Sequence, residues 1–108
     1  MSNVVFRTIN VNLPPVKDQQ GSFTGTTQIS GENIISVDGC LKGWQIQYTD
    51  TGRAMTFVNA FIKIQSVTFS GHTVTYSVIY GLQDEGGTFD WQYQGECDIL
   101  LIVATASN

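Results

Sequence analysis

The sequence has few charged residues, and most of those are acidic. Its 108 residues include five Lys and Arg against nine Asp and Glu, which gives a formal net charge of −4. The five basic residues are scattered singly, whereas binding to a nucleic-acid backbone needs clustered Lys and Arg. We therefore expect neither nucleic acid nor an anionic membrane surface as a partner.

Cysteine and histidine are also scarce, with two residues and one residue. Cys40 and Cys97 do not form a C-x-x-C pair, and three such side chains are too few for a typical structural metal centre. The two cysteines can pair only if their strands are neighbours. Because no secretory signal is visible, we expect two free, partly buried thiols, and neither a metal nor another cofactor.

No apolar run approaches the ~20 residues that a membrane helix needs. The first residues, Met1 to Arg7, lack the basic start and the apolar stretch of a secretory signal. These absences predict a soluble protein that is synthesised in the cytoplasm and leaves it, if at all, by a non-classical route.

Catalytic motifs are absent as well. The sequence has no G-x-S-x-G, no P-loop and no strand-linked dinucleotide fingerprint. Its one histidine, His72, falls in a predicted hairpin turn with no nucleophile close to it in sequence, so we expect a solvated turn residue rather than a general base. We therefore expect that the protein is not an enzyme.

The residues that are abundant favour strands. Aromatic and β-branched side chains fit a pleated, half-buried surface, and they outweigh the strong helix formers here. Eleven glycines lie mostly between apolar runs, where turns need them. The length is typical of one domain, so we assign residues 1–108 to a single all-β domain.

The first half of the chain predicts short strands separated by turns. The proline pair Pro14-Pro15 is expected to end the first strand, since proline cannot donate to a ladder. The turn pair Asp38-Gly39 is expected to end another strand. The predicted segments are a strand over 4–12, a polar loop over 16–25, and short strands over 24–30 and 33–37.

The second half alternates more clearly. Residues 40–49 place Trp44, Ile46 and Tyr48 on one buried face. The stretch 54–69 changes its apolar phase twice, which predicts irregularities near Asn59 and Ser66. The remaining expected segments are turns over 50–53 and 70–73, a strand over 73–80, a loop over 84–87, and an aromatic strand that carries Phe89, Trp91 and Tyr93.

The last strand, residues 97–105, is apolar on both faces, so both faces must be shielded from water, either by other parts of the fold or by a partner subunit. It is expected to be either a central strand or a strand that enters a subunit interface. In total the pattern predicts an antiparallel β-sandwich of six to eight strands, and a small barrel remains the alternative.

One acidic and aromatic segment is the best candidate for a site. Sugars are bound by aromatic rings that stack on their apolar face and by carboxylates and amides that bind their hydroxyls. A solvated loop, a Ca²⁺ site and a glycosidase pair are the alternatives, although the EF-hand spacing is absent. The candidate carbohydrate-binding residues are Asp84, Glu85, Asp90, Trp91 and Gln92.

The order of segments over residues 37–105 resembles the H-type lectin domain. The resemblance rests on Trp44-Gln45-Ile46-Gln47-Tyr48, Val74-Thr75-Tyr76-Ser77-Val78, the acidic loop at Asp84, and the apolar strand that closes in Ile102-Val103-Ala104. It implies a six-stranded antiparallel sandwich that assembles as trimers or hexamers and binds glycans of the N-acetylgalactosamine or galactose type.

Two functions are therefore expected from the sequence. The first is a carbohydrate-binding, lectin-like module that acts as a multivalent homo-oligomer, because linked weak sites gain avidity without new contacts. The alternative is a structural or assembly protein of a phage-like or other particle, since low charge and apolar sheet faces suit it equally.

Overall fold

The computed structural model describes residues 2–31, 33–49 and 57–106, and the regular structure within them consists of strands. The strands form two antiparallel sheets of three, with order β1-β6-β3 in sheet A and β2-β5-β4 in sheet B. The prediction of an all-β antiparallel chain is confirmed, with six strands. Their bounds are β1 Ser2–Val16, β2 Gly21–Gln28, β3 Asn33–Tyr48, β4 Phe57–Ser70, β5 Thr73–Asp84 and β6 Tyr93–Ala106.

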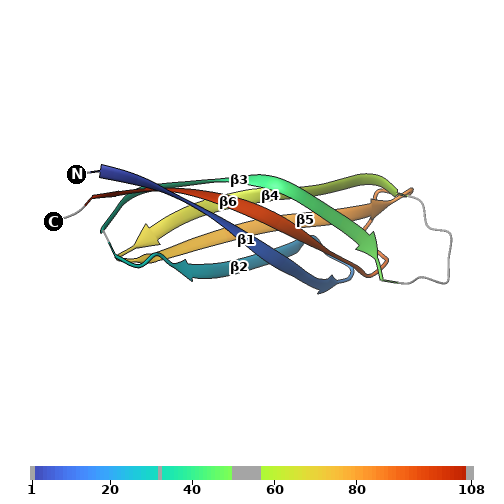
Figure 1. The fold of residues 1–108 in the computed structure, drawn as a ribbon. Coiled ribbons are helices and arrows are strands. Elements are labelled where there is room, and N and C mark those ends of the chain that lie inside the picture. The colour runs from blue at the N-terminus through green and yellow to red at the C-terminus, as the bar shows by residue number, and fades with distance from the viewer. Residues whose placement is uncertain (1, 32, 50–56, 107–108) are drawn as a thin grey trace.

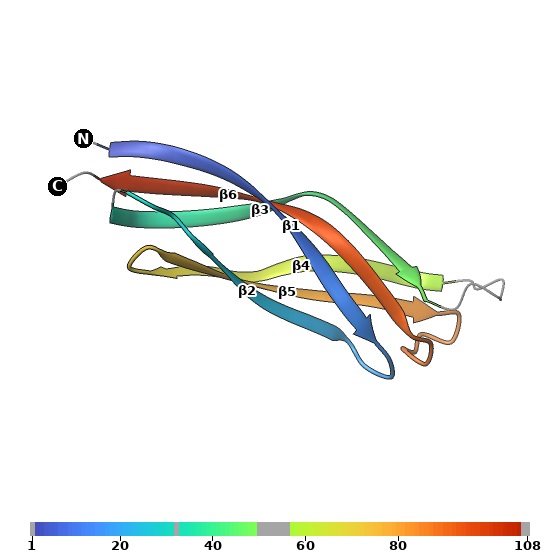
Figure 2. The same ribbon diagram turned by 60° about the horizontal axis from the view of Figure 1, so that its bottom comes forward.

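The two sheets form two layers of an elongated molecule of 57 × 19 × 18 Å (Figure 1). Both layers twist along their length, as the turned view makes plain (Figure 2). Ser2 pairs with Ala106, so both ends of the described chain lie at what we call the terminal end, together with the β4–β5 turn. The connection from β5 to β6, residues 85–92, lies at the opposite, loop end.

The core lies between the layers and is built from alternating residues. On β5 the predicted alternation is confirmed: Val74 and Val78 are fully buried and Tyr80 nearly so. On β6, Ile99 and Leu101 face them and are fully buried. β6 is the central strand of sheet A, which is one of the two positions that its apolar run predicted.

Two predicted strand ends are wrong. β1 runs through Pro14 and Pro15 to Val16, with a register shift after Leu13. It is an edge strand, where a missing N–H can be tolerated. β3 likewise continues through Asp38-Gly39, because pairing with β6 holds both residues in the ladder. The two strands expected over 33–37 and 40–49 are therefore one.

Other predictions are confirmed or corrected by the pairing. β4 has register shifts at Phe57/Asn59 and at Ile64/Ser66, as its phase changes predicted. The turn over 70–73 is confirmed, with exposed His72 in it. The expected loop over 16–25 is wrong in its second part, since β2 begins at Gly21. The turn expected over 50–53 lies outside the described residues.

The aromatic strand expected around Phe89 and Trp91 is a loop up to Gln92. Backbone hydrogen bonds fold this segment on itself, from Asp84 N to Thr88 O (3.0 Å) and from Gly87 N to Asp84 O (2.9 Å). Tyr93 alone of the three aromatics starts β6, where it is fully buried.

Cys40 and Cys97 are both free, as expected. Cys97 is buried, but Cys40 is exposed, which corrects the expectation that both thiols are partly buried. The described part of the chain contains no helix long and apolar enough to cross a membrane.

Candidate functional site

The carboxylate of Asp84 is occupied within its own loop. Its Oδ1 accepts hydrogen bonds from the backbone N–H of Gly86 (2.9 Å) and Thr88 (3.2 Å), and its Oδ2 accepts one from Thr88 Oγ1 (2.8 Å). These bonds, first of all that from the Thr88 hydroxyl, lower the pKa of Asp84 below its usual value of 3.8. Through these hydrogen bonds Asp84 holds residues 84–88 in the loop conformation.

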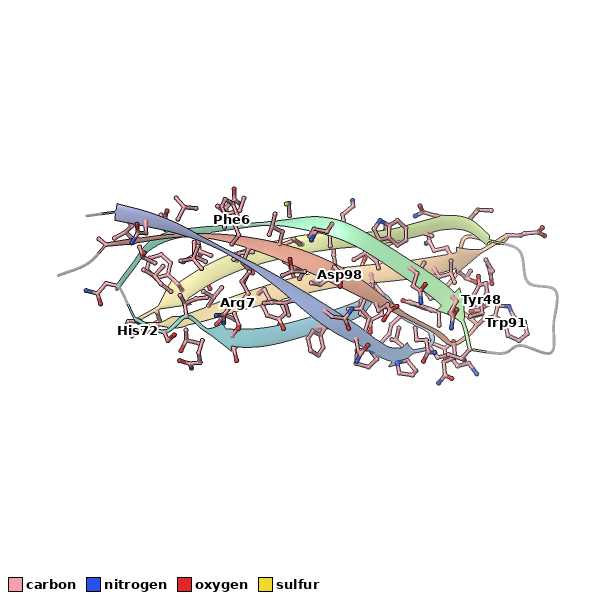
Figure 3. All side chains as sticks on the ribbon, in the orientation of Figure 1. Phe6, Arg7, Tyr48, His72, Trp91 and Asp98 are labelled. Carbon is pink, nitrogen blue, oxygen red and sulfur yellow. The ribbon has the colours of Figure 1, made fainter. Side chains whose placement is uncertain are left out.

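The other predicted sugar-binding residues lie on the same loop but do not form one cluster of hydrogen bonds. Gln92 accepts a hydrogen bond from Thr49 Oγ1 at its Oε1 (2.8 Å), which ties the loop to the end of β3. Glu85 and Asp90 are exposed, and Trp91 is half-buried at the loop end, near Tyr48 (Figure 3). The described residues hold no group of three acidic, histidine or cysteine side chains suited to a metal ion.

A second and larger polar surface lies on the outer face of sheet A. Outward residues alternate with core residues along each strand, and the pairing aligns them in rows across the sheet. One row joins Asn10, Asp98 and Gly43, and the next joins Asn12, Glu96 and Gln45. We call this the amide half of the face; its members are Asn10, Asn12, Gly43, Gln45, Gln47, Gln94, Glu96 and Asp98.

The amide half is hollowed into a groove. A hollow of about 300 Å³ adjoins one of about 200 Å³, and both are lined by Gln45 and Glu96. Besides these two, the larger hollow is lined by Asn12, Leu13, Pro14, Pro15, Gln47, Gln94 and Gly95, and the smaller by Asn10, Gly43, Trp44, Cys97 and Asp98.

Gly43 leaves the smaller hollow open. A Cβ built on Gly43 would meet nothing within 4 Å. Across the row, Asn10 Nδ2 donates to Asp98 Oδ1 (2.9 Å), which fixes that carboxylate on the groove wall. Trp44 pairs opposite buried Cys97, so it lies on the core-facing side of β3 as predicted. However, 46% of its surface is exposed on this edge strand, which corrects the expectation that the residue is buried.

Beneath this wall the thiol of Cys97 is inert. Burial first, and then the negative charge of Asp98, raise the pKa of Cys97 above its usual value. The thiol therefore stays protonated near neutral pH and is a poor nucleophile. No covalent chemistry from this residue enters the groove.

Sequence reasoning missed the groove for a physical reason. Its residues come from three segments, 10–15, 43–47 and 94–98, that meet only through strand pairing. One signal was visible: the outward residues of β6 change from apolar Ala104, Ile102 and Leu100 to polar Asp98 and Glu96.

No protein-family model, curated protein or solved structure matches this chain. The site must therefore be interpreted from its own chemistry.

Proposed function

We propose that this chain is a carbohydrate-binding, lectin-like β-sandwich module that works as a multivalent homo-oligomer. The observation that supports the proposal is the groove of the amide half, in which amides and carboxylates from three strands surround two adjoining hollows. Such side chains can each make paired hydrogen bonds to neighbouring sugar hydroxyls.

The groove also offers apolar surfaces. The rings of Pro14 and Pro15 line the larger hollow. Trp44 is among the residues that line the smaller hollow, but its pairing opposite Cys97 places its side chain on the core-facing side of β3. A sugar ring has an apolar C–H face that packs against such rings, while its hydroxyls turn to the polar wall. The hollows are shallow and of a size suited to one or two sugar units.

The predicted loop residues Glu85, Asp90 and Trp91 remain a second candidate contact surface. Asp84 and Gln92 contribute less directly, because their oxygens accept hydrogen bonds from Thr88 and Thr49. We expect the groove to provide most of the binding and the loop to modulate it.

The test is a glycan array, including galactose and N-acetylgalactosamine glycans, read for the wild-type protein and for Gly43→Leu. The new side chain would fill the smaller hollow without a backbone clash. The expected result is binding by the wild type and a loss of at least ~10-fold in Gly43→Leu, or about 1.4 kcal/mol.

Thr26→Leu is the matched control, since it places the same side chain at an exposed position of sheet B. It should bind like the wild type. Failure of the folded wild type to bind any glycan would refute the proposal, and equal binding by Gly43→Leu would move the site away from the groove.

One observation favours the alternative function, a structural or assembly protein. The other half of the outer face of sheet A exposes large apolar side chains, among them Phe6. Light scattering of the purified protein separates the two functions, because particle components form open-ended assemblies and a lectin forms a closed, small oligomer.

A further inference from the structure

The outer face of sheet A is divided along β6 into two halves of opposite character. Towards the terminal end the outward residues of β6 are Leu100, Ile102 and Ala104. Their neighbours on β1 are Val4 and Phe6, which are 57% and 66% exposed. We call this surface the apolar half.

On sheet A the exposed apolar residues adjoin one another across two strands, whereas those of sheet B, Val58 and Phe69, stand apart near opposite ends of β4. Figure 3 shows Phe6 pointing away from the two layers, whereas Arg7 points towards β2 and donates to Gln28 O. The outer face of sheet B, by contrast, is rich in hydroxyls, such as the Thr24–Ser77 pair (2.7 Å). The outer face of sheet A therefore carries a continuous apolar surface that water solvates poorly.

The apolar half carries little charge. Asp38, opposite Ile102, is the charged residue among its rows, and its carboxylate accepts a hydrogen bond from Gly39 N (2.8 Å). Lys42 marks the border, where its Nζ donates to Thr8 Oγ1 (3.4 Å). A surface of this kind suits a partner that is itself flat, apolar and nearly uncharged.

We infer that the apolar half is the contact surface between copies of this chain. The inference rests on the proposed function in so far as that function calls for a homo-oligomer. A second copy supplies a face with the same flatness, apolar character and low charge, as interfaces between identical subunits require. The net charge of −4 disfavours the other apolar partner, an anionic membrane.

The area predicts how strong the association is. Two strands about 4.8 Å apart, over about six residues at 3.3 Å each, give an apolar face about 10 Å wide and 20 Å long. Each copy would thus bury a few hundred Å², which is below the ~800 Å² per partner of a standard interface. We expect reversible association with a midpoint at micromolar protein.

The groove stays accessible in such an assembly. The row of Phe6 and Ile102 lies six residues from the row of Asn12 and Glu96, or about 20 Å along the strands. The twist of the sheet turns the two halves in different directions, so two copies that touch at the apolar half diverge at the amide half.

The experiment measures molar mass by size-exclusion chromatography with light scattering, from about 1 to 200 µM. Wild type is expected to associate, and Phe6→Asp and Val4→Asp to stay monomeric over the same range. Val58→Asp is the matched control, because Val58 is 60% exposed but lies on β4 of sheet B. It should associate like the wild type.

Cys40 gives an independent readout. It lies on β3 opposite Leu100, at the margin of the apolar half, and it is the exposed thiol while Cys97 is buried. Its labelling by a maleimide should slow at least ~3-fold as wild-type protein passes from monomer to oligomer, and should not change in Phe6→Asp.

A monomeric wild type at 200 µM would overturn the inference, as would dissociation by Val58→Asp to the same extent. Binding of a monomeric wild type to phosphatidylcholine vesicles, abolished by Phe6→Asp, would assign the face to a membrane instead. These outcomes are distinct from a failure of the proposed function, because monovalent sugar binding by the Phe6→Asp monomer is measured separately by titration.

Discussion

At the scale of the residue, Asp84 shows how a side chain predicted for ligand binding can be used by the fold. Both of its oxygens accept hydrogen bonds from the loop that it begins. The signal that suggested a site was an acidic and aromatic segment, but an aspartate two residues before a glycine pair is equally the signal of a loop that is closed by its own aspartate.

The lowered pKa of Asp84 predicts a pH-dependent stability. Since the folded pKa lies below 3.8, the contribution is fully present above that pH and is lost as the pH falls through the lower, folded value. Wild type should therefore lose more thermal stability than Asp84→Asn between about pH 5 and pH 2. Thermal unfolding at each pH, followed by circular dichroism, measures the difference.

Asp90→Asn is the control for this prediction, because Asp90 is an exposed aspartate of the same loop. Its unfolding should follow the wild type across the range. If Asp84→Asn and wild type lost stability in parallel, the hydrogen bonds to Asp84 would have no thermodynamic role.

At the scale of the element, β1 is the instructive case. Its prolines interrupt the ladder, and the register shift after Leu13 turns the carbonyl of Pro14 towards sheet B. Tyr80 on β5 donates its hydroxyl to that carbonyl (2.6 Å), so one side chain joins the two layers where the ladder is weakest.

Removing this bond should destabilise the fold. Tyr80→Phe leaves a partly buried carbonyl without its partner, at a cost of about 1–2 kcal/mol in the free energy of unfolding. Urea denaturation measures it. Tyr76→Phe is the matched control on the same strand, since the Tyr76 hydroxyl has no hydrogen bond within the described part of the chain; an equal loss in both variants would contradict the role given to Pro14.

Elements also show what the sequence could and could not predict. The phase changes of β4 located its irregularities at Asn59 and Ser66, because alternation is a local property. Pro14 and the Asp38-Gly39 pair were misleading, since their effect depends on whether the strand is an edge and on what it pairs with. The groove was not predictable, because Asn12, Glu96 and Gln45 meet only across strands.

At the scale of the whole molecule, one face would carry both proposed activities. If the apolar half joins copies and the amide half binds glycans, dissociation should cost avidity but not intrinsic affinity. Phe6→Asp should bind a densely glycan-coated surface ~100-fold more weakly than the associated wild type, yet match it within about twofold in titration with a soluble monovalent sugar.

Surface plasmon resonance at high and low glycan density makes this comparison, with protein above the association midpoint. Val58→Asp should retain the full density dependence. A density dependence that persists in monomeric Phe6→Asp would mean that each chain carries more than one sugar site.

The strand order has a further consequence for how the molecule is made. In sheet A, β6 lies between β1 and β3, which do not pair with each other. Neither β1 nor β3 therefore has a strand to pair with in this sheet until β6 has been synthesised. Sheet B can be complete as soon as β5 has emerged. Pairings of such high sequence separation form slowly. The apolar side chains of β1 and β3 therefore stay exposed on the nascent chain until β6 has been synthesised and has paired with both strands. In vivo, the yield of this protein should depend on chaperones that bind nascent chains during that interval.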